Sequence, residues 1–167
     1  NTFSEEGTVA LSTFSFTEDG SLLAYAISES GSDWRKIIVI DAQTKEQVGD
    51  TLRDVKFSGI SWKGNEGFYY SSYDKPKEGS DLSGLNMNHK LYYHQLGTPQ
   101  DTDELVFGGE ATPRRYVGGS VSEDDRYLQI TAANGTSGNE LYVKDLQNDG
   151  QIIQVIGDFE HDHYILH

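Results

Sequence analysis

The chain has 167 residues, of which 13 are Lys or Arg and 27 are Asp or Glu, which gives a formal net charge of −14. This charge repels phosphate backbones and anionic lipid surfaces, so we expect neither a nucleic-acid nor a membrane partner. Cysteine is absent, which excludes a disulfide framework, a thiolate nucleophile and a zinc site built on cysteine.

Three segments of the chain share one pattern, in which a short strand is followed by an acidic or Gly-containing turn and then by a second strand. In chain order they are residues 13–28 (TFSFTEDGSLLAYAIS), 59–73 (GISWKGNEGFYYSSY) and 118–132 (GGSVSEDDRYLQITA). A third strand follows each segment, beginning at Arg35, His89 and Asn139, and a fourth apolar run closes each unit. A repeat of this length and internal order predicts one four-stranded unit per repeat.

These units predict an all-β fold, a partial β-propeller of about three four-stranded antiparallel blades. The expected blades span residues 13–54, 55–110 and 115–158, and residues 159–167 are expected to begin a further blade. A polar stretch, residues 74–89, is expected to be a loop inserted between the second and third strands of the second blade. A β-sandwich also has closely spaced strands, but the repeated order favours the propeller.

Propeller blades bury their faces against neighbouring blades, so about 4 to 8 of them are needed to close a ring. Three blades do not close, and the chain begins at Asn1 and ends in a strand-like run. We therefore expect a piece of a longer protein, and self-association of the isolated chain through its open faces. No apolar run has the length of a membrane-spanning helix. The sequence does not indicate the compartment, and a soluble protein, cytoplasmic or periplasmic, is expected.

Four runs of the sequence resemble the propeller of the prolyl oligopeptidase family of serine peptidases. They are AISESGSDWRKI (26–37), VKFSGISW (55–62), HKLYYHQLGT (89–98) and VGGSVSEDDRYL (117–128). Oligopeptidase B is the nearest relative with a similar pattern, and the SGSDW and KLYYHQLGT runs favour the prolyl enzymes. The resemblance implies a seven-bladed propeller on an α/β-hydrolase domain with a Ser-Asp-His triad. The sequence has no Gly-x-Ser-x-Gly elbow, so we expect that domain to be absent and the chain alone to be non-catalytic.

The resemblance also implies substrate-binding residues. Phe57, in the VKFS run, is expected to form an apolar wall for a peptide side chain, and Tyr116 or Val117, ahead of the Gly-Gly pair, to occupy a similar position. A member of the family that this chain resembles places a cationic side chain in the loop after the strand that corresponds to residues 127–130. Residues 131–139 contain no Arg or Lys, so that contact is not expected here. No cofactor is implied.

Four further sequence patterns could indicate a functional site, but each also has a simpler structural interpretation. His161 and His163, with His167, have a spacing that could ligate zinc, but a solvated cluster is commoner, and we predict no metal site. The acidic groups at the turns favour solubility and chain reversal over acid–base or calcium chemistry. Asn134 begins either a glycosylation sequon or a tight turn. Trp34 and Trp62 are either a ligand platform or, more commonly, core.

The resemblance thus implies the non-catalytic, substrate-gating part of a serine endopeptidase that cleaves short peptides after proline. Its expected partners are short proline-containing peptides and the missing α/β-hydrolase domain. The alternative is a stand-alone propeller that serves as a scaffold for protein interactions.

Overall fold

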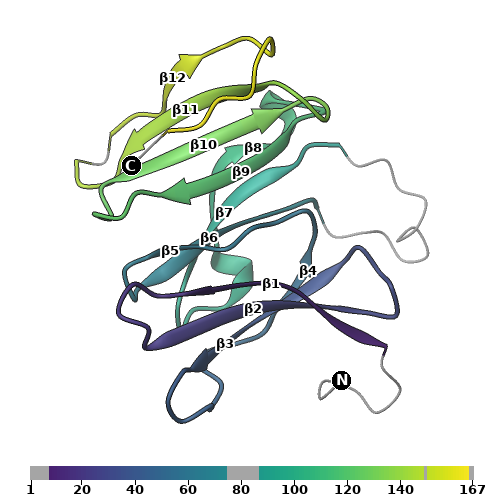
Figure 1. Ribbon diagram of the computed structural model, residues 1–167, viewed down its shortest axis with the longest axis vertical. Coiled ribbons are helices and arrows are strands. Elements are labelled where there is room, and N and C mark those ends of the chain that lie inside the picture. Colours follow the sequence, from purple (N-terminus) through teal and green to yellow (C-terminus); the bar gives the residue numbers. More distant parts are fainter. Residues whose placement is uncertain (1–7, 75–86, 149, 166–167) are drawn as a thin grey trace.

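The structure is a computed structural model that describes residues 8–74, 87–148 and 150–165. Its strands form three antiparallel sheets, each built from four strands in chain order (Figure 1). The first sheet comprises β1 (Val9–Phe16), β2 (Leu22–Glu29), β3 (Arg35–Asp41) and β4 (Leu52–Val55). The second comprises β5 (Ser61–Lys63), β6 (Gly67–Ser72), β7 (Lys90–Gln95) and β8 (Glu104–Gly108). The third comprises β9 (Tyr116–Val121), β10 (Tyr127–Ala133), β11 (Asn139–Asp145) and β12 (Ile153–Ile156).

The predicted all-β fold of three four-stranded blades is confirmed. Two short 3-10 helices, η1 (Gln100–Thr102) and η2 (Gly109–Ala111), flank β8. None of the helices in the described ranges is long and apolar enough to cross a membrane. Strand β5 contacts β1 on one side and β9 on the other, so the first strand of each blade lies toward a shared axis.

The first core fills the space between the first and second sheets. Strands β2 and β3 alternate buried and half-buried residues, because successive side chains of a strand point to opposite faces. The first sheet contributes Ala24, Ala26, Ile37, Val39, Leu52 and Val55, and the second contributes Trp62, Phe68 and Tyr70. The indole N–H of Trp62 donates to the Ser15 carbonyl at 3.0 Å, so this Trp belongs to the core between blades.

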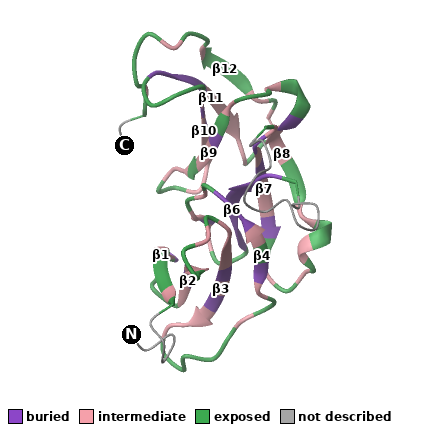
Figure 2. Ribbon diagram, turned by 90° about the vertical axis from the view of Figure 1, so that its right-hand side faces the viewer, coloured by how far each residue is buried: buried purple, intermediate pink, exposed green. Residues whose placement is uncertain are grey.

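The second core lies between the second and third sheets and contains Tyr69, Leu91, Val117, Leu128, Ile130 and Ala132. Strand β6 supplies both cores, and every one of its residues is buried. Figure 2 shows this burial along β6, in contrast to the exposed β12. At Gly119 a Cβ atom would lie 2.9 Å from the Leu91 side chain, so the absence of a side chain there lets the two sheets approach.

Two segments differ from the sequence expectation. Strand β1 begins at Val9, ahead of the expected Thr13, because a register shift between Leu11 and Thr13 interrupts the alternation that marks a strand. Residues 157–165 form no strand; instead the Asn139 N–H donates to the His161 carbonyl at 3.1 Å. Most of the predicted inserted loop, residues 75–86, lies outside the described residues, as do residues 166–167.

The turn of the first blade is joined to that of the second by Asp19. Its carboxylate accepts hydrogen bonds from the Ser21 N–H at 2.9 Å and from the Asn65 side chain at 2.8 Å. These bonds, that of Ser21 first, hold the pKa of Asp19 well below its usual range. A carboxyl with a lowered folded-state pKa stabilises the fold above its unfolded pKa of about 4, and this stabilisation is lost as the pH falls.

We therefore expect the free energy of unfolding to decrease as the pH falls below about 4. The Asp19→Asn variant should be less stable at pH 7 and should show a shallower decrease, because one of the responsible carboxyls has been removed. Urea unfolding at a series of pH values between 7 and 3 measures the free energy of unfolding at pH 7 and the steepness of its decrease. Some decrease remains in the variant, since the pKa values of Asp41, Asp124 and Asp145 are also lowered. An equal slope in both proteins would contradict the role of Asp19.

Candidate functional site

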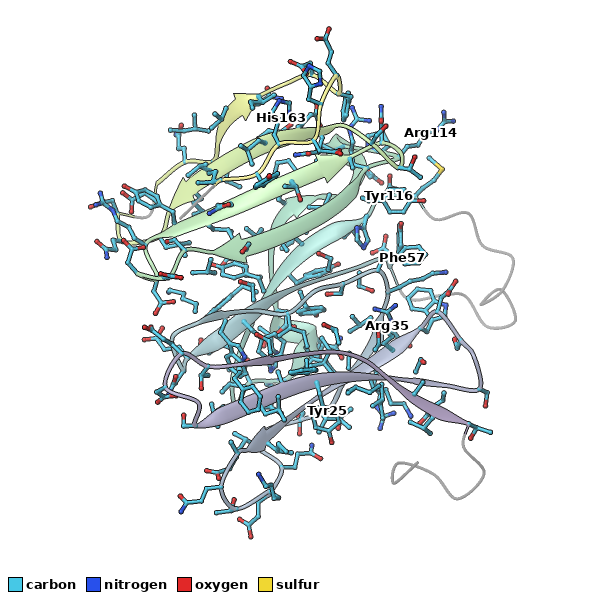
Figure 3. The ribbon with its side chains drawn as sticks, in the orientation of Figure 1. Tyr25, Arg35, Phe57, Arg114, Tyr116 and His163 are labelled. Carbon is cyan, nitrogen blue, oxygen red and sulfur yellow. The ribbon has the colours of Figure 1, made fainter. Side chains whose placement is uncertain are left out.

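Two exposed aromatic side chains from separate segments of the chain meet at one side of the molecule. Phe57 lies in the connector from β4 to β5, and Tyr116 is the first residue of β9. Their ring centroids are 5.9 Å apart, and the Tyr73 ring, just after β6, lies 6.2 Å from Phe57. Figure 3 shows Phe57 and Tyr116 side by side. Phe57 is 39% and Tyr116 46% exposed, so their rings form an apolar surface open to solvent, and the Tyr73 ring is buried beside them; these three residues are here called the aromatic wall.

The backbone conformation of the β4–β5 connector places the Phe57 ring at the surface. Phe57 has a φ of 54°, and Asp54, three residues earlier, has a φ of 55°. A bulky residue in this left-handed region costs roughly 1–2 kcal/mol, and it persists only where the surroundings hold it. The connector is held by β6, since the Ser71 N–H donates to the Ser58 hydroxyl at 2.8 Å and the Ser72 hydroxyl donates to the Asp54 carbonyl.

A lysine cation lies against the aromatic wall. The Lys56 side chain is only 8% exposed, and its ammonium lies 5.2 Å from the ring centroids of both Trp34 and Phe57. The Asp33 carboxylate is 3.6 Å from the same ammonium. A cation at such distances is attracted to the ring faces, so Lys56 links the two aromatic side chains. Trp34 therefore lies beside the site rather than in either core.

The remaining predicted residue, Val117, is buried in the second core and does not reach the surface. Its N–H donates to the Nδ1 of His89 at 2.9 Å. The His89 ring is buried beside Tyr73, with 4.5 Å between ring centroids, and burial lowers the pKa of His89. The structure thus brings Phe57 and Tyr116 together on the surface, and places Val117 behind them.

The sequence did not single out Lys56, Tyr73 or His89 as members of this site. Lys56 directly precedes Phe57 in the VKFS run, and His89 begins the HKLYYHQLGT run, so both lay within the segments that carried the family resemblance. Arg114, an exposed residue two positions before Tyr116, is a further cation on this side of the molecule (Figure 3).

The histidines near the end of the chain are placed by backbone contacts. The His163 N–H donates to the Asn139 side-chain oxygen at 2.7 Å, and the rings of His161 and His163 lie 6.3 Å apart. Within residues 8–74, 87–148 and 150–165, no three His, Cys, Asp or Glu side chains are grouped so as to hold a metal ion. His167 lies outside the described residues.

The aromatic wall is suited to binding and not to bond cleavage. Both ring nitrogens of His89 are engaged by backbone groups, and burial raises the pKa of Tyr73 to about 12, so neither side chain is placed to exchange protons with a ligand near neutral pH. The exposed faces of Phe57 and Tyr116 can contact an apolar group.

Comparison with known proteins gives consistent matches along the chain. The family model described as prolyl oligopeptidase, N-terminal beta-propeller domain, matches residues 1–167. A prolyl endopeptidase of Elizabethkingia meningoseptica is 60% identical over 160 residues, which cover 96% of this chain and 23% of that protein. Prolyl oligopeptidase A of Amanita bisporigera is 34% identical, over 89% of this chain and 22% of the relative.

Solved structures show the same relation. A structure from a study of two prolyl endopeptidases has a TM-score of 0.83 and 35% identity, and the match covers 93% of this chain and 22% of that one. Prolyl oligopeptidase B of Galerina marginata, bound to a 35-residue hydrolysis and macrocyclization substrate, has a TM-score of 0.84 and 26% identity. That match covers 95% of this chain and 24% of the solved one. The chain therefore spans less than a quarter of the length of these relatives.

Proposed function

Because the chain belongs to the family of prolyl oligopeptidase N-terminal β-propeller domains, we propose that it is the substrate-gating part of a serine endopeptidase that cleaves short peptides after proline. The relatives named as prolyl endopeptidases and prolyl oligopeptidases support the reaction class. The peptide chemistry, acyl transfer through a serine nucleophile, then belongs to an α/β-hydrolase domain that lies elsewhere in the enzyme.

The aromatic wall is the observation that carries this proposal. Two rings, Phe57 in the β4–β5 connector and Tyr116 in β9, are exposed side by side, although large apolar side chains of a folded domain are more often packed in its core. A peptide side chain that contacts both rings loses water from two aromatic faces at once. The wall thus contributes affinity for the peptide without taking part in the acyl transfer.

We expect Phe57→Ala, in the enzyme that carries this domain, to raise the KM for a short proline-containing peptide by roughly 5–30-fold, since contacts of an apolar ring are typically worth about 1–2 kcal/mol. The kcat should be unchanged, because the ring binds the ground state and the transition state equally. Steady-state kinetics with a fluorogenic peptide measure both constants. Leu105→Ala, on the exposed outer strand β8, is the matched control and should leave KM unchanged.

Two results would contradict the proposal. Equal KM values for the Phe57→Ala variant and the unaltered enzyme would exclude the wall from substrate binding. Hydrolysis of the same peptide by the 167-residue chain alone would show that the chain carries the chemistry itself.

A further inference from the structure

A single buried histidine joins the two segments that carry the aromatic wall. The His89 ring lies just before β7 and is fully buried. Its Nε2 is 3.0 Å from the Lys56 carbonyl oxygen in the β4–β5 connector, and its Nδ1 is 2.9 Å from the Val117 nitrogen in β9. One imidazole therefore connects the segment between the first two blades to the first strand of the third.

The two backbone partners fix the state of this imidazole. The Val117 N–H can only donate, so Nδ1 accepts; the Lys56 carbonyl can only accept, so Nε2 carries the hydrogen and donates. A protonated ring would set an Nδ1–H against the Val117 N–H. Burial lowers the pKa of His89, which favours the neutral ring that both contacts require.

The backbone of His89 is fixed as well. Its carbonyl accepts a hydrogen bond from the Gly109 N–H at 2.9 Å. Gly108 has a φ of 97°, and a Cβ atom there would lie only 2.3 Å from the same carbonyl oxygen. The end of β8 therefore packs directly on the His89 main chain. A ring whose backbone is held in this way has little freedom to follow the segments it contacts, so those segments take their positions from it.

Each backbone partner of His89 is adjacent in sequence to a ring of the wall. Lys56 directly precedes Phe57, and Val117 directly follows Tyr116. We propose that His89 is the positioning residue of the aromatic wall, and that it sets the separation of Phe57 and Tyr116 by joining the Lys56 carbonyl to the Val117 amide. This inference rests on the proposed function, because it concerns how the wall meets the peptide.

Two isosteric variants separate the two contacts of His89. In His89→Asn the side-chain oxygen lies near the position of Nδ1 and can accept from Val117, but no atom reaches Lys56. In His89→Gln the amide lies near the position of Nε2 and can donate to Lys56, but the Val117 N–H loses its partner. We expect each variant to raise the KM for the short peptide by about 3–10-fold, the usual effect of one net hydrogen bond, with kcat unchanged.

The deciding measurement is the same pair of variants in a Phe57→Ala background. Without the Phe57 ring, His89 no longer sets the separation of two rings, so we expect its effect on KM to fall below about 2-fold. An undiminished effect of His89→Asn or His89→Gln in that background would overturn the inference while leaving the proposed function intact. If Phe57→Ala itself leaves KM unchanged, the proposed function fails instead.

A second measurement needs no variant and stays decisive if the variants do not fold. Nitrogen NMR of the imidazole in the 167-residue chain should show a protonated Nε2 and an unprotonated Nδ1 for His89. This pattern should persist below the usual pKa of His, about 6.5. Among the described residues, the ionisable side chains recorded beside the ring are Tyr73 and Tyr116, and Lys56 contacts the ring through its backbone carbonyl. A protonated Nδ1 near neutral pH would overturn the inference.

Discussion

Phe68→Ala is expected to lower the free energy of unfolding of the chain by about 3–5 kcal/mol, the usual cost of truncating a fully buried Phe. Phe68 lies in β6 and has no solvent exposure. Its ring contacts Trp62 edge to face at a centroid distance of 5.2 Å, and the His94 ring at 5.4 Å. Its removal leaves a cavity between the first and second sheets, which these rigid rings cannot refill.

Urea unfolding followed by Trp fluorescence measures this loss, since Trp62 is in contact with the deleted ring. Phe57→Ala is the matched control, because it deletes the same atoms from a side chain that is 39% exposed. We expect it to cost less than about 1.5 kcal/mol. Phe68→Leu should fall between the two. Equal losses for Phe57→Ala and Phe68→Ala would show that the first core does not stabilise the chain as its packing indicates.

The sequence alone predicted the order of the strands but not which of these two phenylalanines is buried. The repeat predicted the three blades because each strand and turn recurs in the same order. In β3 and β10 of the structure, buried residues such as Ile37 and Leu128 alternate with half-buried ones, since a strand places every second residue on the same face. Strand β6 has no such alternation, because both of its faces are packed against other blades.

The aromatic wall was only partly predictable. Phe57 and Tyr116 were located by the family resemblance, but no pattern in the sequence showed that their rings meet. The contacts that place them involve His89, which is 33 residues from Lys56 and 28 residues from Val117. Periodicity is a local signal, and it carries no information about which connectors from different blades come together. A buried histidine between two strands is, moreover, indistinguishable in sequence from an exposed one.

A second buried histidine has a different role, within one blade. The Nδ1 of His94 lies 2.8 Å from one carboxylate oxygen of Asp103, and the Tyr70 hydroxyl donates to the other oxygen at 2.8 Å. The His94 and Asp103 side chains are almost completely buried. Burial, followed by the hydrogen bond to Asp103, raises the pKa of Tyr70 well above its usual value, so the phenol remains a donor. These three residues connect β6 and β7 to the segment just before β8.

Asp103→Ala should therefore lower the free energy of unfolding by about 3–5 kcal/mol, because it leaves two buried polar groups, on His94 and Tyr70, without their partner. Asp103→Asn keeps the shape and one acceptor oxygen, so it should recover part of this loss. Tyr70→Phe removes a single donor and should cost about 1–2 kcal/mol. Urea unfolding of the unaltered chain, the three single variants and the Asp103→Ala, Tyr70→Phe double variant measures these losses in the free energy of unfolding.

The double variant decides whether Asp103 and Tyr70 are coupled. In a network the second deletion costs less once the first has been made, so the double variant should lose less than the sum of the single losses. A strictly additive loss would mean that Asp103 and Tyr70 stabilise the blade independently of each other. The network precedes β8, and the residue directly after β8 is Gly109, whose N–H donates to the His89 carbonyl. Loss of Asp103 should accordingly also speed hydrogen exchange at the Gly109 amide, which would connect the interior of the second blade to the position of the aromatic wall.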